Sequence, residues 1–238
     1  MLLLDAGDTL SGEWGAQREH AQVFLEAMDS MGYDAMALGQ LDLALGIPRL
    51  LELAQDHSVR LLSCNVIDVA MGSPVFTPYT IIERGGLRFG ILGVSELQAL
   101  QLLPEDRDRY KVLDPTTVVA KWLPKARADS DIVILLSHLG LERDRELAQQ
   151  VEGIHVIVGG RSKKVLSTPQ RVGDTLILQA GFDGGWLGRL DVELEQGQLA
   201  NAQETIIALE ATIRSDPEIE ALVQAYYQRR FARPSPTP

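Results

Sequence analysis

The sequence predicts an α/β fold with either one mixed sheet or two sheets packed face to face. Short apolar runs alternate with amphipathic helical stretches over about the first 160 residues. A strand-rich part follows, from residue 174 to residue 198. An apolar fraction of 45% and a charged fraction of 23% are those of an ordinary globular protein with enough chain to bury a core.

The elements follow in order from periodicity and from helix stop signals. Strands are predicted at 2–7, 34–39, 60–66, 131–140 and 155–160, a hairpin around Gly85-Gly86 at 79–94, and two or three antiparallel strands within 174–198. Helices are predicted at 16–32, 47–57, 115–128, 142–151 and 217–231. Pro124 should end or kink its helix, because proline lacks the N–H group and clashes with the preceding turn.

One domain is predicted over residues 1–215, followed by a C-terminal helix at 216–231 and a Pro-rich tail or linker at 232–238. The chain enters its first strand at once, which suggests that an N-terminal part of the natural protein is missing. It shows neither a leader pattern nor a run of about 20 apolar residues, so we expect no membrane span, and the compartment is left open.

The net charge of −11 argues against a nucleic-acid polymer as partner, since such proteins carry a basic footprint. The charge does not exclude a small anion bound at one basic spot. Cys64 is the single cysteine, which excludes an internal disulfide, and its apolar surroundings favour a buried structural thiol.

Polar residues stand at the carboxyl ends of five predicted strands, where open α/β sheets bind their ligands. They are Asp8, Gln40 with Asp42, Asn65, His138 and Arg161. Strand ends are also polar simply because they enter solvent, so this pattern alone supports both a functional site and an ordinary surface.

The stretches "LLLDAGDTLSG", "MGYDAMALG", "SCNVID", "VILLSHLG", "HVIVGG" and "LILQAGFDGGWLGRLDVEL" resemble the N-terminal catalytic domain of the bacterial 5′-nucleotidases. These proteins are calcineurin-like metallophosphoesterases. The resemblance runs to about residue 225 and implies a two-layer αββα sandwich with mixed sheets, whose strand ends hold two divalent metals. It also implies a first strand carrying an Asp-x-His motif, which this chain lacks.

The resemblance assigns Asp8 and His138 as retained metal ligands, with Asp8 bridging both ions. Other positions of the family site are altered. Gln40 replaces a ligand asparagine, Leu41 a catalytic histidine, Ala44 its partner aspartate, and Arg161 and Lys163 two histidines. A two-metal hydrolase holds its ions about 3.5–4 Å apart, which two protein ligands cannot do. Asp42 would give at best an Asp/Asp/His trio for one loosely held metal.

Two interpretations of Arg161 stand side by side. In one, its guanidinium occupies a vacated metal position and pairs with Asp8. In the other, Arg161, Lys163 and Lys164 form a solvated loop, and for the two lysines we favour this interpretation.

Two functions are considered first. One is that of a catalytically impaired family member that acts as a binding or scaffold module. The other is that of an active metal-dependent phosphomonoesterase or 5′-nucleotidase with a reorganised site. A third alternative is phosphate binding without hydrolysis at Gly159, Gly160 and Arg161, with Lys163 and backbone N–H groups contributing. No cofactor is expected; Mn, Zn or Mg would bind only in the active alternative. Partners would be other domains or chains, c-type haem modules among them, and the resemblance implies export as is usual for relatives.

Overall fold

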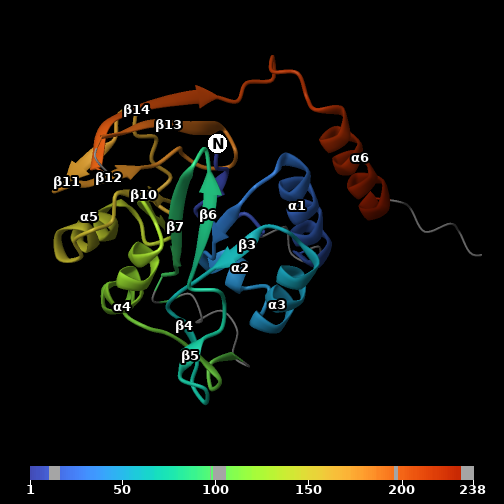
Figure 1. The fold of residues 1–238 in the computed structure, drawn as a ribbon. Helices are drawn as coiled ribbons and strands as arrows, with labels where there is room; N and C mark the ends of the chain where they lie inside the picture. Colours follow the sequence, from blue (N-terminus) through green and yellow to red (C-terminus); the bar gives the residue numbers. More distant parts are fainter. Residues whose placement is uncertain (11–16, 97, 99–105, 196–197, 232–238) are drawn as a thin grey trace, which may run out of the picture.

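The structure, a computed structural model, describes residues 1–10, 17–96, 98, 106–195 and 198–231. Two sheets pack face to face, and each is covered on its outer side by helices (Figure 1). The predicted α/β class is therefore correct, in the form of two sheets rather than one. The Pro-rich tail predicted at 232–238 lies outside the described residues.

The first sheet is parallel, with the strand order β1-β2-β3. Its strands are β1 (Leu4–Asp5), β2 (Ala35–Ala37) and β3 (Arg60–Leu62). The connections carry α1 (Gln17–Met31), α2 (Gln40–Leu43) and α3 (Ile47–Asp56). The sequence predicts an apolar stripe of Ala21, Phe24, Leu25 and Met28 on α1; Ala21, Leu25 and Met28 are buried in the outer core on this side, whereas Phe24 is 39% exposed.

The second sheet has the order β11-β12-β10-β9-β7-β6. Its strands are β6 (Tyr79–Arg84), β7 (Leu87–Val94), β9 (Ile132–Ser137), β10 (Val156–Gly159), β11 (Gln170–Val172) and β12 (Thr175–Leu178). The four central strands are parallel and the two edge strands antiparallel. This sheet is covered by α4 (Pro115–Ala128) and α5 (Leu141–Gln150). The mixed sheet predicted from the sequence is confirmed here.

The inner core lies between the two sheets and consists of aliphatic side chains from both. The first sheet contributes Ala35, Ala37 and Leu62, and the second contributes Ile91, Ile134 and Leu136 among others. Strands buried on both faces read as continuous apolar runs, which explains why β9 has no polar alternation. The αββα sandwich implied by the resemblance is therefore what the chain forms.

Smaller elements surround this sandwich. A three-stranded sheet has the order β5-β4-β8, and the hairpin β13-β14 forms a sheet of its own. The elements are β4 (Val66–Asp68), β5 (Ser73–Pro74), β8 (Tyr110–Val112), β13 (Trp186–Glu195), β14 (Gln198–Ala208) and α6 (Pro217–Phe231). Helix α6 lies beside α1 (Figure 1), where the Tyr226 ring is 6.1 Å from the ring of His20.

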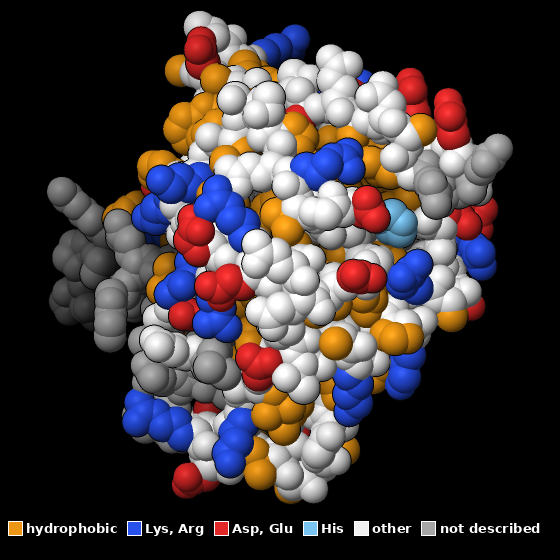
Figure 2. Space-filling view, turned by 90° about the vertical axis from the view of Figure 1, so that its left-hand side faces the viewer, with side chains coloured by type: hydrophobic (Ala, Val, Ile, Leu, Met, Phe, Trp, Pro, Cys, Tyr) orange, Lys and Arg blue, Asp and Glu red, His pale blue; other side chains and the backbone are white. Residues whose placement is uncertain are grey.

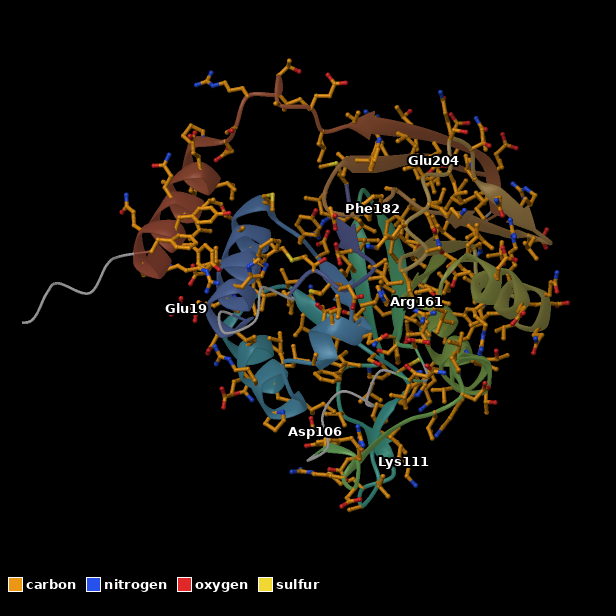
Figure 3. The ribbon with its side chains drawn as sticks, turned by 180° about the vertical axis from the view of Figure 1, so that it is seen from behind. Glu19, Asp106, Lys111, Arg161, Phe182 and Glu204 are labelled. Carbon is orange, nitrogen blue, oxygen red and sulfur yellow. The ribbon has the colours of Figure 1, made fainter. Side chains whose placement is uncertain are left out.

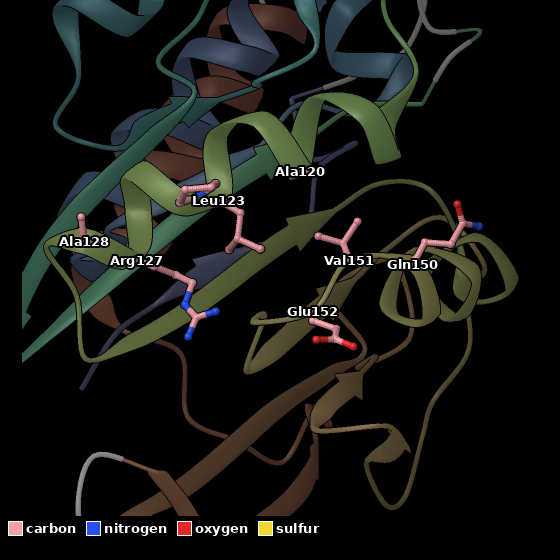
Figure 4. A pocket seen from close by; sticks show the side chains of 8 residues that line it. Ala120, Leu123, Arg127, Ala128, Gln150, Val151 and Glu152 are labelled. Atoms are coloured by element: carbon pink, nitrogen blue, oxygen red, sulfur yellow. The ribbon is translucent and has the colours of Figure 1, made fainter.

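Two sequence expectations need correction. Pro124 does not end the helix, which continues to Ala128, and a kink at this position stays a prediction. Pro124 and Ala120, whose carbonyl loses its usual partner, are both exposed and line a hollow of about 530 Å³ beside α4 (Figure 4). Water can therefore donate a hydrogen bond to the Ala120 carbonyl oxygen, which lowers the free-energy cost of a proline inside the helix. The second difference is β14, a strand as far as Ala208 that the sequence pattern did not indicate beyond residue 198.

Candidate functional site

The strand ends of both sheets meet at one edge of the sandwich. Asp8 follows β1, Gln40 follows β2, and His138 and Arg161 follow the parallel neighbours β9 and β10. His138 is joined to the segment after β1 by two contacts: its Nδ1 lies 2.8 Å from the Ala6 carbonyl oxygen, and its Nε2 lies 2.9 Å from Asp8 Oδ2. The retained residues Asp8 and His138 are thus brought together from opposite sheets.

The Asp8–His138 contact is an ion pair in a mostly buried setting, since the His138 side chain is only 2% exposed. Burial would lower the pKa of His138, but the adjacent Asp8 carboxylate outweighs it and the pKa is raised. For Asp8 burial would raise the pKa, whereas His138 and the N–H group of Leu41, 2.7 Å away, lower it. Both groups therefore favour their charged forms.

The backbone around Asp8 is arranged for close approach. Asp8 has φ 64°, a left-handed conformation that a non-glycine residue adopts at a cost. Gly39 faces it, and a Cβ at Gly39 would lie 2.1 Å from Asp8 Oδ1. Gly7 is equally constrained, with φ 95° and its missing Cβ directed at the Gly39 backbone. Strained positions of this kind cluster at functional sites.

Asp42 is fully buried and binds the main chain. Its carboxylate accepts the N–H groups of Asp8 at 2.7 Å, Leu10 at 2.8 Å and Gly39 at 2.9 Å. Burial raises the pKa of Asp42 to about 7, against the effect of these donors. These three bonds hold the loop after β1 against the turn that begins α2, and a metal-binding role for Asp42 stays a prediction.

The altered family positions do not supply ligands. Leu41, expected from the resemblance to replace a catalytic histidine, is 46% exposed and carries no ligand atom in its side chain. Gln40 is half-buried in the first turn of α2, and Ala44, which donates its N–H to the Gln40 carbonyl, ends that helix. Asn65 is buried and binds the backbone of Ser95 and Leu113, a structural role.

Arg161 has φ 65° and turns its guanidinium to Glu96, with Nη2 2.9 Å from Oε1. Its Nη1 lies 3.5 Å from the Leu139 carbonyl oxygen. Glu96 is only 13% exposed, so the arginine compensates a largely buried charge. Pairing of Arg161 with Asp8 stays a prediction; the contacts that define the Arg161 side chain are with Glu96 and Leu139.

Glu96 was missed in the sequence because 79–94 was treated only as a hairpin. The second arm of this hairpin, β7, is also a central parallel strand, so Ser95 and Glu96, the two residues after it, belong to the same edge as His138. The strand-end rule would have found it.

The glycines that end β10 make room for protein groups. A Cβ at Gly159 would lie 2.5 Å from Asp144 Oδ2, and one at Gly160 would lie 3.0 Å from His138 Nδ1 and from the Ala6 carbonyl. The Gly160 N–H already donates to the Ser137 carbonyl at 2.8 Å. An anion at Gly159, Gly160 and Arg161 would therefore depend on the Arg161 side chain, and this use remains a proposal.

Asp144 is a buried acid beside the site that the sequence did not single out. It accepts a hydrogen bond from Ser137 Oγ at 2.5 Å, and burial raises its pKa to about 7. Cys64, in contrast, behaves as predicted: it is fully buried, and burial raises the pKa of its thiol to about 12.

The described residues do not fit a two-metal centre. No three His, Cys, Asp or Glu side chains in the described part of the chain are placed to share one ion. Asp8 and His138 provide two donors that pair with each other, and Asp42 is engaged by backbone N–H groups. The hollow in Figure 4, between α4 and residues 150–152, lies away from these residues.

Charges of both signs alternate over the face shown in Figure 2. The described helices include none with the length and apolar character to cross a bilayer.

The chain matches no protein-family model. It is similar to 5′-nucleotidases from Bos taurus and Homo sapiens, each 29% identical over 249 residues that cover 93% of this chain. A 5′-nucleotidase from Vibrio cholerae is 26% identical and covers 84% of it. The chain spans 42–43% of the length of these relatives.

Solved structures give the same result. A Thermus thermophilus sulfate thiohydrolase, SoxB, in complex with glycerol has a TM-score of 0.88 and 27% identity; the match covers 97% of this chain and 43% of that one. A 5′-nucleotidase precursor from the same species has a TM-score of 0.86 and 26% identity, covering 97% and 50%. The calcineurin-like phosphoesterase YfkN from Bacillus subtilis shares the fold, with a TM-score of 0.80 at 21% identity. The chain is thus similar to 5′-nucleotidases over most of its length and shares the fold of a calcineurin-like phosphoesterase.

Proposed function

We propose that this domain is a catalytically impaired metallophosphoesterase that acts as a binding or scaffold module. The observation that carries the proposal is the pairing of Asp8 with His138 at 2.9 Å, while Gln40, Leu41 and Arg161 stand at the other ligand and catalytic positions of the family. Family members use two ions to activate water and to clamp the phosphoryl oxygens. The described residues would hold neither ion firmly.

The pairs at this edge also account for the charges that remain. His138 compensates Asp8, and Arg161 compensates Glu96. Asp8 and Glu96 thus each have a protein cation beside them in place of a metal, which stabilises these two carboxylates without an ion.

The test is metal analysis of the purified protein combined with p-nitrophenyl phosphate turnover in Mn²⁺ or Co²⁺. We expect less than one metal per chain and no turnover above that of Asp8→Ala. Stoichiometric metal with turnover that Asp8→Ala abolishes would establish the alternative, an active phosphomonoesterase whose further ligands come from outside this sequence.

The domain would act with other domains or chains, since its relatives are more than twice as long. The c-type haem modules expected from the resemblance are one such class. Size-exclusion chromatography with the isolated candidate domain tests each of them.

A further inference from the structure

The loop that follows β10 is bound to the segment that follows β12. Gly181 donates its N–H to the Lys164 carbonyl at 2.8 Å, and Leu166 donates to the Gln179 carbonyl at 3.0 Å. Val165 and Ala180 form an antiparallel bridge between these bonds. The two segments therefore lie side by side at the strand-end edge, and residues 163 and 182 are neighbours across them.

A tight turn presents two aromatic side chains next to this ladder. Asp183 and Gly184 have φ 54° and 64°, and Gly185 donates to the Phe182 carbonyl at 3.1 Å, as in a type I′ turn. The Phe182 and Trp186 rings lie 6.0 Å apart at 47°. Gly181 is required here, because a Cβ on it would lie 2.6 Å from Trp186 Cε3.

These rings are open to solvent although they are held in place. Phe182 is 43% exposed and Trp186 36% exposed. Lys163 Nζ lies 5.2 Å from the centre of the Phe182 ring, within the range of a cation–π contact. The lysine backbone has φ 54°, so the loop holds an unfavourable conformation that brings this cation to the ring. Figure 3 labels Phe182 and Arg161 in the segments after β12 and β10.

We propose that Lys163, Phe182 and Trp186 form a binding platform for a small anion that carries a planar ring. The ring stacks on the exposed aromatic faces, and the oxyanion is neutralised by the ammonium group of Lys163. We do not expect a nucleic-acid strand to bind this surface, because a polyanion is repelled by a chain with a net charge of −11. A ligand with one anionic group avoids most of that repulsion. The inference deepens the proposed binding function and rests on it only in placing the ligand at the strand-end edge.

The probe is phenylphosphonate, whose carbon–phosphorus bond is not a phosphoester. Binding is measured by two-dimensional NMR of the amides of residues 163–166 and 181–187, and its affinity by titration. We expect wild-type protein to bind phenylphosphonate about tenfold more tightly than methylphosphonate or benzyl alcohol, which each supply only one half of the ligand. Phe182→Ala and Lys163→Gln should each weaken binding by about tenfold.

Lys125→Gln is the matched control, because Lys125 Nζ also lies over an aromatic ring, 4.3 Å from the centre of Trp122, on helix α4. This variant should bind like the wild type. The proposal is overturned if phenylphosphonate does not bind, if methylphosphonate binds equally well, or if both platform variants retain wild-type affinity with native circular dichroism. Phosphatase turnover in Mn²⁺ would contradict the proposed loss of catalysis without touching this result.

Discussion

His138 and Asp8 come from strands of different sheets, yet His138 Nε2 lies 2.9 Å from Asp8 Oδ2. The other ring nitrogen is fixed by the Ala6 carbonyl at 2.8 Å. With an acceptor beside each ring nitrogen, the pKa of His138 is raised and the imidazole favours its protonated form. The pair thereby joins the two sheets at the strand-end edge.

Breaking this pair should destabilise the protein. We expect a coupling free energy of about 1–3 kcal/mol in a double-mutant cycle with Asp8→Asn and His138→Gln, measured by urea unfolding near pH 6. A coupling indistinguishable from zero would contradict the ion pair.

The pH dependence of that coupling has a defined sign. The Asp8 pKa is lowered and the His138 pKa is raised. The aspartate contribution is present above its unfolded pKa of about 3.9 and is lost as the pH falls through the folded pKa. The histidine contribution is complete below about 6.5 and is lost as the pH rises through the folded pKa. The coupling should therefore be largest between about pH 4 and pH 6.5 and fall on both sides.

Asp144 should reduce stability at high pH. Burial raises its folded pKa to about 7, so between about pH 4 and 7 the unfolded chain has lost a proton that the folded chain keeps. Unfolding free energy then decreases with rising pH. Asp144→Asn should be more stable than wild type at pH 8 by on the order of 2 kcal/mol and near-neutral at pH 4. Equal effects of Asp144→Asn on the unfolding free energy at both pH values, measured by guanidinium unfolding, would refute this. The pKa of Asp42 is raised as well, so the variant should keep part of the decrease in stability with rising pH.

Gly39→Ala should destabilise the protein by about 2–4 kcal/mol, because the new Cβ would lie 2.1 Å from Asp8 Oδ1 and must displace that carboxylate. Gly185→Ala is the matched control, since the nearest atom to its Cβ is 3.5 Å away. The comparison is made by thermal unfolding. Similar melting temperatures for the two variants would show that Asp8 can move freely.

Arg161→Ala should cost about 1–3 kcal/mol, because it leaves the largely buried Glu96 without its cation. Adding Glu96→Gln should restore part of that loss, since a neutral amide needs no compensating charge. If the double variant is less stable than Arg161→Ala alone in urea titrations, Glu96 has another stabilising partner.

Much of the fold follows from local periodicity. The alternation of apolar runs with amphipathic stretches predicts α1, α3, α5 and the central strands. Each helix buries one face and so has an apolar period, and each central strand is buried on both faces and so forms a short continuous apolar run. Helix α4 shows the limit: Pro124 is a strong local stop signal, but its consequence depends on whether the Ala120 carbonyl faces water. Solvent access of one carbonyl is decided by tertiary packing.

The sequence likewise predicts one part of the candidate site and not the other. Strand-end position predicts that Asp8, His138 and Arg161 share one edge, and they do. Pairing within the edge depends on side-chain direction, which strand positions do not encode. Arg161 therefore meets Glu96, and Asp42, which looked like a metal ligand, binds three N–H groups of the backbone.

In the loop after β10, the residue that fixes the backbone differs from the residues that carry the charge. Ser162 Oγ accepts the Leu141 N–H at 2.7 Å and contacts Gln179 at 3.1–3.2 Å, and both groups are internal. Arg161 and Lys163, on either side of Ser162, direct their side chains elsewhere. The hydrogen bonds of Ser162 that fix the loop therefore do not involve the side chains of Arg161 and Lys163. A protein engineer could therefore change the charge at position 163 while the sandwich keeps its shape, whereas a change at Arg161 would need a compensating change at Glu96.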